Sequence, residues 1–176
     1  IMTGVLFHQV HLVEIKGWAL TEFGACYLLY AGTATAVSLG CGSFVDRYRS
    51  STLLPVYLVP LGFGLALLAG TSSIFAGAVF MMLMGATAGG ETIVLGALCA
   101  EMYGTDHLGA IRSVTTVLVV VATAIAPGVM GWLLDQGVGL DWQLAAMAGY
   151  TLACAFWFAL LRPTISSQCA EAEIRS

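Results

Sequence analysis

Charged side chains are scarce in this chain. Only 9% of its 176 residues are Asp, Glu, Lys or Arg, whereas 59% are hydrophobic and the mean hydropathy is +0.92. Ordinary soluble domains carry about 25% charged residues. This composition therefore argues against a soluble domain, with a very apolar soluble helical protein as the weaker alternative, and it is typical of proteins that lie within a lipid bilayer.

Motifs that carry catalysis are missing as well. The sequence has no Gly-x-Ser-x-Gly, no His-Glu-x-x-His and no glycine-rich phosphate loop that ends in Lys. The five cysteines show no paired spacing, and the closely spaced His8 and His11 have no acidic third ligand beside them. We therefore expect no enzyme, no cofactor, no metal site and no disulfide, and we expect no nucleic acid as a partner.

Long apolar runs are what the sequence has in abundance, and short polar breaks separate them. A helix needs ~20 apolar residues to cross a bilayer, and runs such as VTTVLVVVATAIAP do not alternate as the strands of a membrane barrel do. We therefore predict an all-α integral membrane protein. The predicted spans lie near residues 1–13 (partial), 23–45, 52–69, 74–100, 110–134 and 142–161.

The two ends of the chain carry predictions of their own. Residues 1–13 are apolar but too short to cross the membrane, so we interpret them as the end of a sixth helix whose beginning is missing. Residues 162–176 are polar and open with Arg162-Pro163, a pair that should stop the last helix at the membrane surface. We expect these last residues to form a disordered tail.

Basic residues fall almost entirely on one side when the polar breaks are assigned to alternate sides of the membrane. Only Lys16 falls on the other side. The residues on the common side are Arg47, Arg49, Arg112, Arg162 and Arg175. Because basic residues near span ends are retained in the cytoplasm, we predict a multi-pass protein of the cell (inner) membrane with a cytoplasmic C-terminus.

The first inner break, GSFVDRYRSSTLLP, places Gly42 four positions before Asp46 and Arg47. A small residue lets two helices approach closely, while the Asp-Arg turn can cap helix ends and pair with nearby charges. The pattern resembles the Gly-x-x-x-Asp-Arg turn between the eighth and ninth helices of the major facilitator superfamily. It departs from that family at residues 50–52, which are Ser, Ser and Thr where further basic residues often stand.

The second inner break, EMYGTDHLGAIRS, is similar to the same superfamily's connection between its tenth and eleventh helices. The resemblance implies a salt-bridged cytoplasmic latch in which Glu101 and Arg112 meet the Asp46-Arg47 turn. The start of the chain, GVLFHQVHLVEIKGW, is similar to the end of the seventh helix in bacterial members. The chain would then be the C-terminal six-helix half of a twelve-helix transporter bundle, with the missing N-terminal half and the lipid bilayer as partners.

Glu91 is the one charged residue in the long run from Ile74 to Ala100. The glycines of that run, Gly85, Gly89 and Gly96, share one stripe of the helix, which we predict to pack against a neighbouring helix. Glu91 lies roughly opposite, with Thr87 near it. An ionised carboxylate facing lipid costs at least ~2.5 kcal/mol, so two interpretations stay open: Glu91 lines a transport path, or it is a hydrogen-bonded carboxyl that joins two helices.

A substrate or proton path through Glu91, Thr87, Gln9 and His8 is the resulting site prediction. His8 and Gln9 lie near the outer end of the first helix, where interface residents are the competing interpretation. The whole pattern predicts a secondary active transporter that moves a small-molecule solute by alternating access, with proton coupling as one option and symport or antiport left open. A non-transporting structural or receptor-like membrane protein is the alternative.

Overall fold

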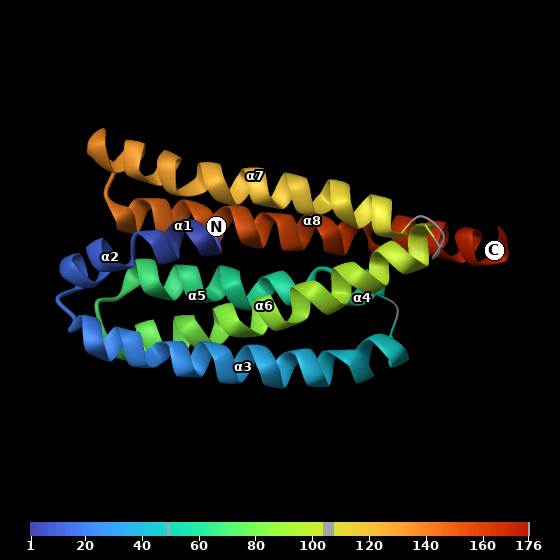
Figure 1. The fold of residues 1–176 in the computed structure, drawn as a ribbon, viewed down its shortest axis with the longest axis horizontal. Coiled ribbons are helices and arrows are strands. Elements are labelled where there is room, and N and C mark those ends of the chain that lie inside the picture. The colour runs from blue at the N-terminus through green and yellow to red at the C-terminus, as the bar shows by residue number, and fades with distance from the viewer. Residues whose placement is uncertain (49, 104–107, 176) are drawn as a thin grey trace.

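The computed structural model describes residues 1–48, 50–103 and 108–175; within these ranges the side chains of residues 43, 46, 51, 164 and 168–175 are not described. The described residues contain helices and no strand. Figure 1 shows the long helices running side by side along the longest axis of the molecule. The elements are α1 (Met2–Phe7), α2 (Gln9–Lys16), α3 (Leu20–Arg47), α4 (Ser50–Leu53), the 3-10 helix η1 (Val56–Leu58), α5 (Val59–Gly70), α6 (Ile74–Tyr103), α7 (Leu108–Asp135) and α8 (Leu140–Arg175).

Four of these helices are long and apolar enough to cross a membrane. Their candidate spans are Leu20–Gly42 in α3, Ile74–Tyr103 in α6, Leu108–Asp135 in α7 and Leu140–Pro163 in α8. Each is mostly apolar with few charged residues, and a helix satisfies its backbone groups internally, as a bilayer requires. The predicted all-α membrane class is confirmed.

The predicted span over residues 52–69 is not one uninterrupted helix. α4 ends at Leu53, η1 follows as a single 3-10 turn, and α5 begins at Val59. Two prolines explain the pieces, because Pro55 caps the start of η1 and Pro60 occupies the first turn of α5. Proline has no N–H to donate to the preceding turn and its ring disfavours helix in the residue before it.

The first residues of the chain form two short helices that meet at His8. His8 itself has φ −95° and ψ 17°, which interrupts the helix between α1 and α2. α2 ends at Gly17, whose φ of +69° is the left-handed conformation that glycine adopts at helix ends. The predicted partial span of residues 1–13 is thus helical, but it bends at His8.

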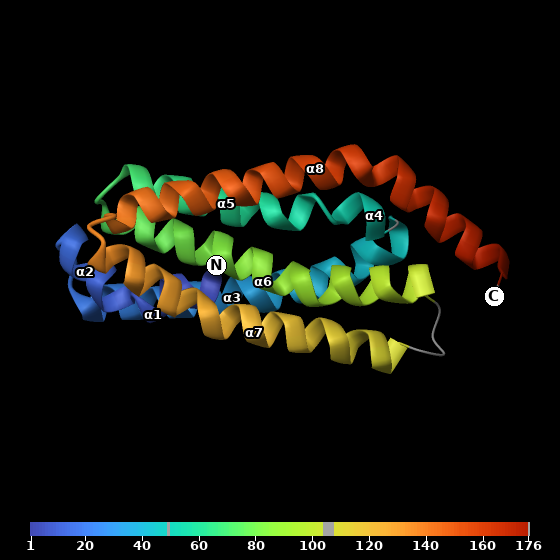
Figure 2. The ribbon, with the colours of Figure 1, turned by 90° about the horizontal axis from the view of Figure 1, so that it is seen from above.

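The predicted disordered tail is wrong, because α8 continues through Pro163 to Arg175. A proline inside a helix removes one hydrogen bond and kinks the helix, and Figure 2 shows the last part of α8 turned away from the line of its first part. The following residues include Gln, Ala and Glu, which are strong helix formers. The helix therefore resumes beyond the proline.

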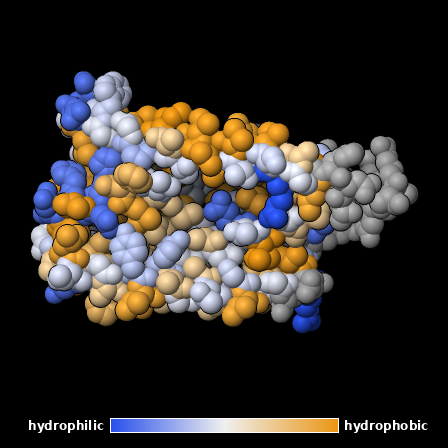
Figure 3. Space-filling model, in the orientation of Figure 1, coloured by the Kyte–Doolittle hydropathy of each residue, from blue (hydrophilic) through white to orange (hydrophobic). Residues whose placement is uncertain are grey.

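α6 is the central helix of the bundle and α7 the most peripheral. Of the candidate span in α6, 44% is buried inside the molecule, against 6% for the span in α7. Figure 2 shows α6 between α5 and α8 on one side and α3 and α7 on the other. In the view of Figure 3, hydrophobic side chains cover much of the surface and hydrophilic ones gather at the end that carries α2.

Candidate functional site

A small cavity between α6 and α7 contains the carboxylate that the sequence singled out. Its volume is about 210 Å³. Glu91 lines it from α6 and Arg112 lines it from the first turns of α7, so one acidic and one basic side chain face the same space. The complete lining is Glu91, Thr92, Leu95, Gly96, Cys99, Arg112, Thr115, Thr116 and Val119.

Gly96 gives Arg112 its place against α6. A Cβ atom built on Gly96 would lie 3.0 Å from Nη2 of Arg112 and 3.7 Å from its Cζ. A larger residue at this position would therefore push the guanidinium away from α6. The predicted packing stripe divides here, because Gly96 lies beside a side chain of α7 while the other two glycines face α3.

The two charges of the cavity form no ion pair with each other, and the amino group of Ile1 is a further charge that acts on Glu91. Neither Glu91 nor Arg112 has an ion-pair or side-chain hydrogen-bond partner in the described part of the chain, whereas Lys16 and Asp141 elsewhere form an ion pair of 2.7 Å. Thr115 and Thr116 donate their hydroxyls to the carbonyls of Ile111 and Arg112, at 3.0 and 2.8 Å. Their oxygens keep lone pairs, so the threonines can accept hydrogen bonds from a ligand.

Thr87 does not line this cavity. Its side chain is 1% exposed and its hydroxyl donates to the carbonyl of Leu83 in the same helix, at 3.2 Å. The preceding turns of α6 pack on α5, since a Cβ atom on Gly64 would meet both Phe80 and Leu83. Thr87 is therefore not part of the cavity lining, although it lies one turn before Glu91 on the same helix.

His8 and Gln9 also lie outside the lining of the Glu91 cavity. Gln9 accepts a hydrogen bond of 2.5 Å from the hydroxyl of Tyr27, which ties α2 to α3. Nδ1 of His8 lies 3.0 Å from the carbonyl oxygen of Gly4, and its Nε2 lies 3.6 Å from where a Cβ on Gly131 would stand. Gln9 thus joins α2 to α3, while His8 bonds to the preceding turn and its ring lies beside Gly131 of α7.

Among the residues of the predicted cytoplasmic latch, Glu101 has Ser50 as its hydrogen-bond partner. Both carboxylate oxygens of Glu101 accept hydrogen bonds from Ser50: Oε1 from the backbone N–H at 3.1 Å and Oε2 from the hydroxyl at 2.7 Å. Arg47 is exposed, Gly42 has no atom near a built Cβ, and the side chain of Asp46 lies outside the described residues. Arg112 faces the cavity of Glu91.

Ser50 is therefore a residue that the sequence analysis missed. Ser50 departs from the basic pattern of the family, and serine is a frequent residue at the start of a helix, where backbone N–H groups have no acceptor within the helix. Ser50 is 0% exposed and begins α4. The contact fastens the end of α6 to the start of α4.

Gly85 and Gly89 lie at the contact between α6 and α3. A Cβ atom at Gly85 would clash with the carbonyl oxygen of Tyr30, and one at Gly89 would clash with that of Ala34. The hydroxyl of Ser38 donates to the carbonyl of Gly89 at 3.1 Å. Two helix backbones can approach this closely only where side chains are absent.

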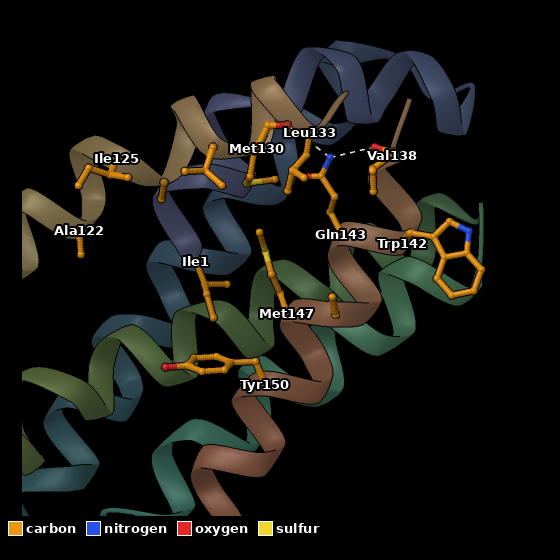
Figure 4. A pocket seen from close by; sticks show the side chains of 13 residues that line it. Ile1, Ala122, Ile125, Met130, Leu133, Val138, Trp142, Gln143, Met147 and Tyr150 are labelled. Carbon is orange, nitrogen blue, oxygen red and sulfur yellow. Dashed lines mark hydrogen bonds between the residues drawn. The ribbon is translucent and has the colours of Figure 1, made fainter. Parts of the chain in front are cut away.

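A second cavity, of about 580 Å³, lies between α7 and α8 (Figure 4). Its lining is almost entirely apolar. Nε2 of Gln143 donates to the carbonyls of Met130 and Val138, at 3.3 and 3.0 Å, while its Oε1 is buried with no partner among the described residues. This cavity is larger than the first, but it has no ionisable carboxylate or basic side chain, so the Glu91 cavity is the candidate functional site.

Spanning helices around a cavity with charged walls define a polytopic membrane protein with a polar site inside its bundle. The family model of the Major Facilitator Superfamily matches residues 1–173, and the chain belongs to this family of membrane transporters. The resemblance noted at the two inner breaks is thereby confirmed. Members of the family are transporters rather than enzymes. No curated protein and no solved structure matches the chain.

Proposed function

We propose that this chain is the C-terminal half of a secondary transporter, and that the cavity between α6 and α7 lies on the path of a small solute. The observation that supports it is the pair of Glu91 and Arg112, which face one cavity and form no ion pair among the described residues. Charges inside a bilayer are costly and typically mark a substrate or ion path. In related architectures the solute site lies between two halves that rock about it.

The exposed face of α7 supports a second half as the partner in this proposal. α7 leaves a continuous apolar surface uncovered, and Met130 is its one buried residue among those described. Residues of this surface include Val114, Val117, Leu118 and Val121. In this proposal, part of the surface meets lipid and the part beside the cavity closes against an N-terminal half. The whole is a multi-pass protein of the inner membrane with a cytoplasmic C-terminus.

Glu91 is the proton-coupling group in this proposal. It is the one carboxylate within the cavity, and it is half-buried on the central helix. A carboxylate that gains and loses a proton as the cavity opens to either side would couple solute movement to the proton gradient. Its exchange of charge needs no nucleotide and no bound cofactor, which suits a secondary transporter.

The test uses the native full-length transporter in proteoliposomes that contain a pH-sensitive dye. Addition of amino acids, organic acids, sugars and amines in turn identifies the solute that drives proton flux. Glu91→Gln keeps size and hydrogen bonding but cannot titrate, so proton-coupled flux should be lost while solute exchange in the absence of a gradient persists.

Glu22→Gln is the matched control, because Glu22 is an exposed carboxylate at the start of α3, and it should retain full flux. A Glu91→Gln protein of equal abundance with unchanged proton flux would show that another group couples the proton. Glu91→Leu then tests the competing packing role, since a carboxyl that only joins helices predicts loss of folded protein with Leu and full activity with Gln.

A further inference from the structure

We propose that the cavity between α6 and α7 takes a small zwitterion, with the cationic end of the solute at Glu91 and the anionic end at Arg112. The inference rests on the proposed function and names the class of its solute. It is carried by the placement of the two side chains in one cavity, together with the size and lining of that cavity.

Opposite charges in one cavity that do not meet each other call for a ligand with both charges. Within a bilayer an unpaired charge is costly, and a ligand group of opposite charge that pairs with it lowers that cost. A solute with one charge would pair with either Glu91 or Arg112 and leave the other exposed to the cavity. A zwitterion satisfies both and adds no net charge to the site.

The two charges reach the cavity at different levels of α6. Gly96, against which the guanidinium of Arg112 lies, follows Glu91 by five positions on α6. That spacing corresponds to about 7.5 Å along the helix axis and about 140° around it. The carboxylate and the guanidinium therefore enter the same cavity from separate positions, and a solute that carries both charges can form a charge-assisted hydrogen bond at each end.

Volume and lining agree with this assignment. A cavity of about 210 Å³ has room for a small solute and not for a large one. Thr115 and Thr116 can accept hydrogen bonds from an ammonium group, while Leu95 and Val119 offer apolar contact for a short hydrocarbon chain. These features match a small amino acid or a similar molecule.

The test compares solutes that differ only in charge. The purified full-length transporter is titrated with 2-aminobutyrate, 4-aminobutyrate, butyrate and butylamine, and binding is followed by calorimetry. The two zwitterions differ in the distance between their charges, so their relative affinity reports how far apart the site holds the ammonium and the carboxylate. We expect 2-aminobutyrate to bind at least tenfold more tightly than either butyrate or butylamine. Equal binding of a singly charged analogue, or no binding of either zwitterion, would overturn the assignment.

Variants then test which end lies where. Glu91→Gln should weaken 2-aminobutyrate binding about tenfold and leave the weak binding of butyrate unchanged. Arg112→Gln should weaken 2-aminobutyrate similarly while leaving butylamine unchanged. Gly96→Val should displace the guanidinium and act like Arg112→Gln, with an unfolding midpoint that shows the protein still folds. A uniform loss for all four ligands in every variant would mean that the residues only maintain the structure.

The two proposals can fail separately. If another solute drives proton flux and the zwitterions neither bind nor compete with it, the transporter stands and the zwitterion assignment falls. If 2-aminobutyrate binds as expected but no solute of any class drives flux in proteoliposomes, the assignment stands and the transport proposal falls. If an N-terminal half supplies partners for Glu91 and Arg112, the zwitterions should not bind. That is the first of these two outcomes.

Discussion

Lys16 shows how this protein treats a buried charge that has no part in the candidate site. Its side chain is 3% exposed at the end of α2, and its ammonium lies 2.7 Å from a carboxylate oxygen of Asp141 at the start of α8. The Asp141 side chain is 53% exposed, so water screens part of the interaction. Lys16 has an ion-pair partner within the bundle, whereas Glu91 and Arg112 have none among the described residues. This contrast supports a functional role for Glu91 and Arg112.

Removal of the Asp141 carboxylate should destabilise the bundle. Asp141→Asn leaves the ammonium of Lys16 buried without its counter-ion, and we expect the free energy of unfolding in detergent to fall by about 2 kcal/mol, less than for a fully buried pair. The double variant Lys16→Met with Asp141→Asn should recover most of the loss, because it removes the buried charge as well. Equal stability of Asp141→Asn and wild type would show that the pair contributes little.

At the residue scale, the sequence marks features that depend on neighbouring residues and misses contacts between separate helices. Glu91 stood out because it is a lone charge in an apolar run, and that signal is local. Arg112 was assigned to a latch and Ser50 to no role, because their contacts with α6 depend on how separate helices meet. The hydrogen bonds of Glu101 to Ser50 join positions 51 apart in the chain, and no local pattern marks such a pair.

At the scale of elements, close packing between α3 and α6 should depend on particular glycines. Gly85→Ala places a Cβ against the backbone carbonyl of Tyr30, and a backbone cannot yield as a flexible side chain can. The free energy of unfolding should fall by about 2 kcal/mol. The matched control is Gly32→Ala, also in a long helix, where nothing lies within 4 Å of the added atom. Its effect should stay within ~0.5 kcal/mol, and equal losses in both variants would argue against the close contact.

The positions of the prolines do not by themselves predict where the helices of this chain end. Pro55 and Pro60 coincide with breaks around η1, whereas Pro127 and Pro163 lie inside continuous helices. All four remove one backbone donor, so the residue type alone does not distinguish them. The outcome depends on whether the residues on both sides form helix strongly enough to offset the lost hydrogen bond, and on whether the neighbouring helices allow a bend.

At the scale of the whole molecule, the sequence predicted the class of the protein and the positions of its four long helices better than their arrangement. α7 has the highest mean hydropathy of the four candidate spans, 2.2, yet only 6% of it is buried, whereas α6 has a hydropathy of 1.6 and is 44% buried. Lipid tails are as apolar as leucine, so hydropathy cannot tell a lipid-facing helix from a central one. The glycines of α6 were the better signal of its central place.

The orientation of the whole molecule is a prediction that cysteine labelling can test. The full-length protein would carry single cysteines in a background from which the native ones have been removed. Gly139→Cys lies in the turn between α7 and α8, where the backbone accepts a side chain, unlike neighbouring Gly137 with its φ of +84°. Ser167→Cys lies in the last part of α8. Because the basic residues predict a cytoplasmic C-terminus, an impermeant maleimide should label position 139 in intact cells and position 167 only after the membrane is permeabilised. The reverse pattern at both positions would overturn the assignment of sides.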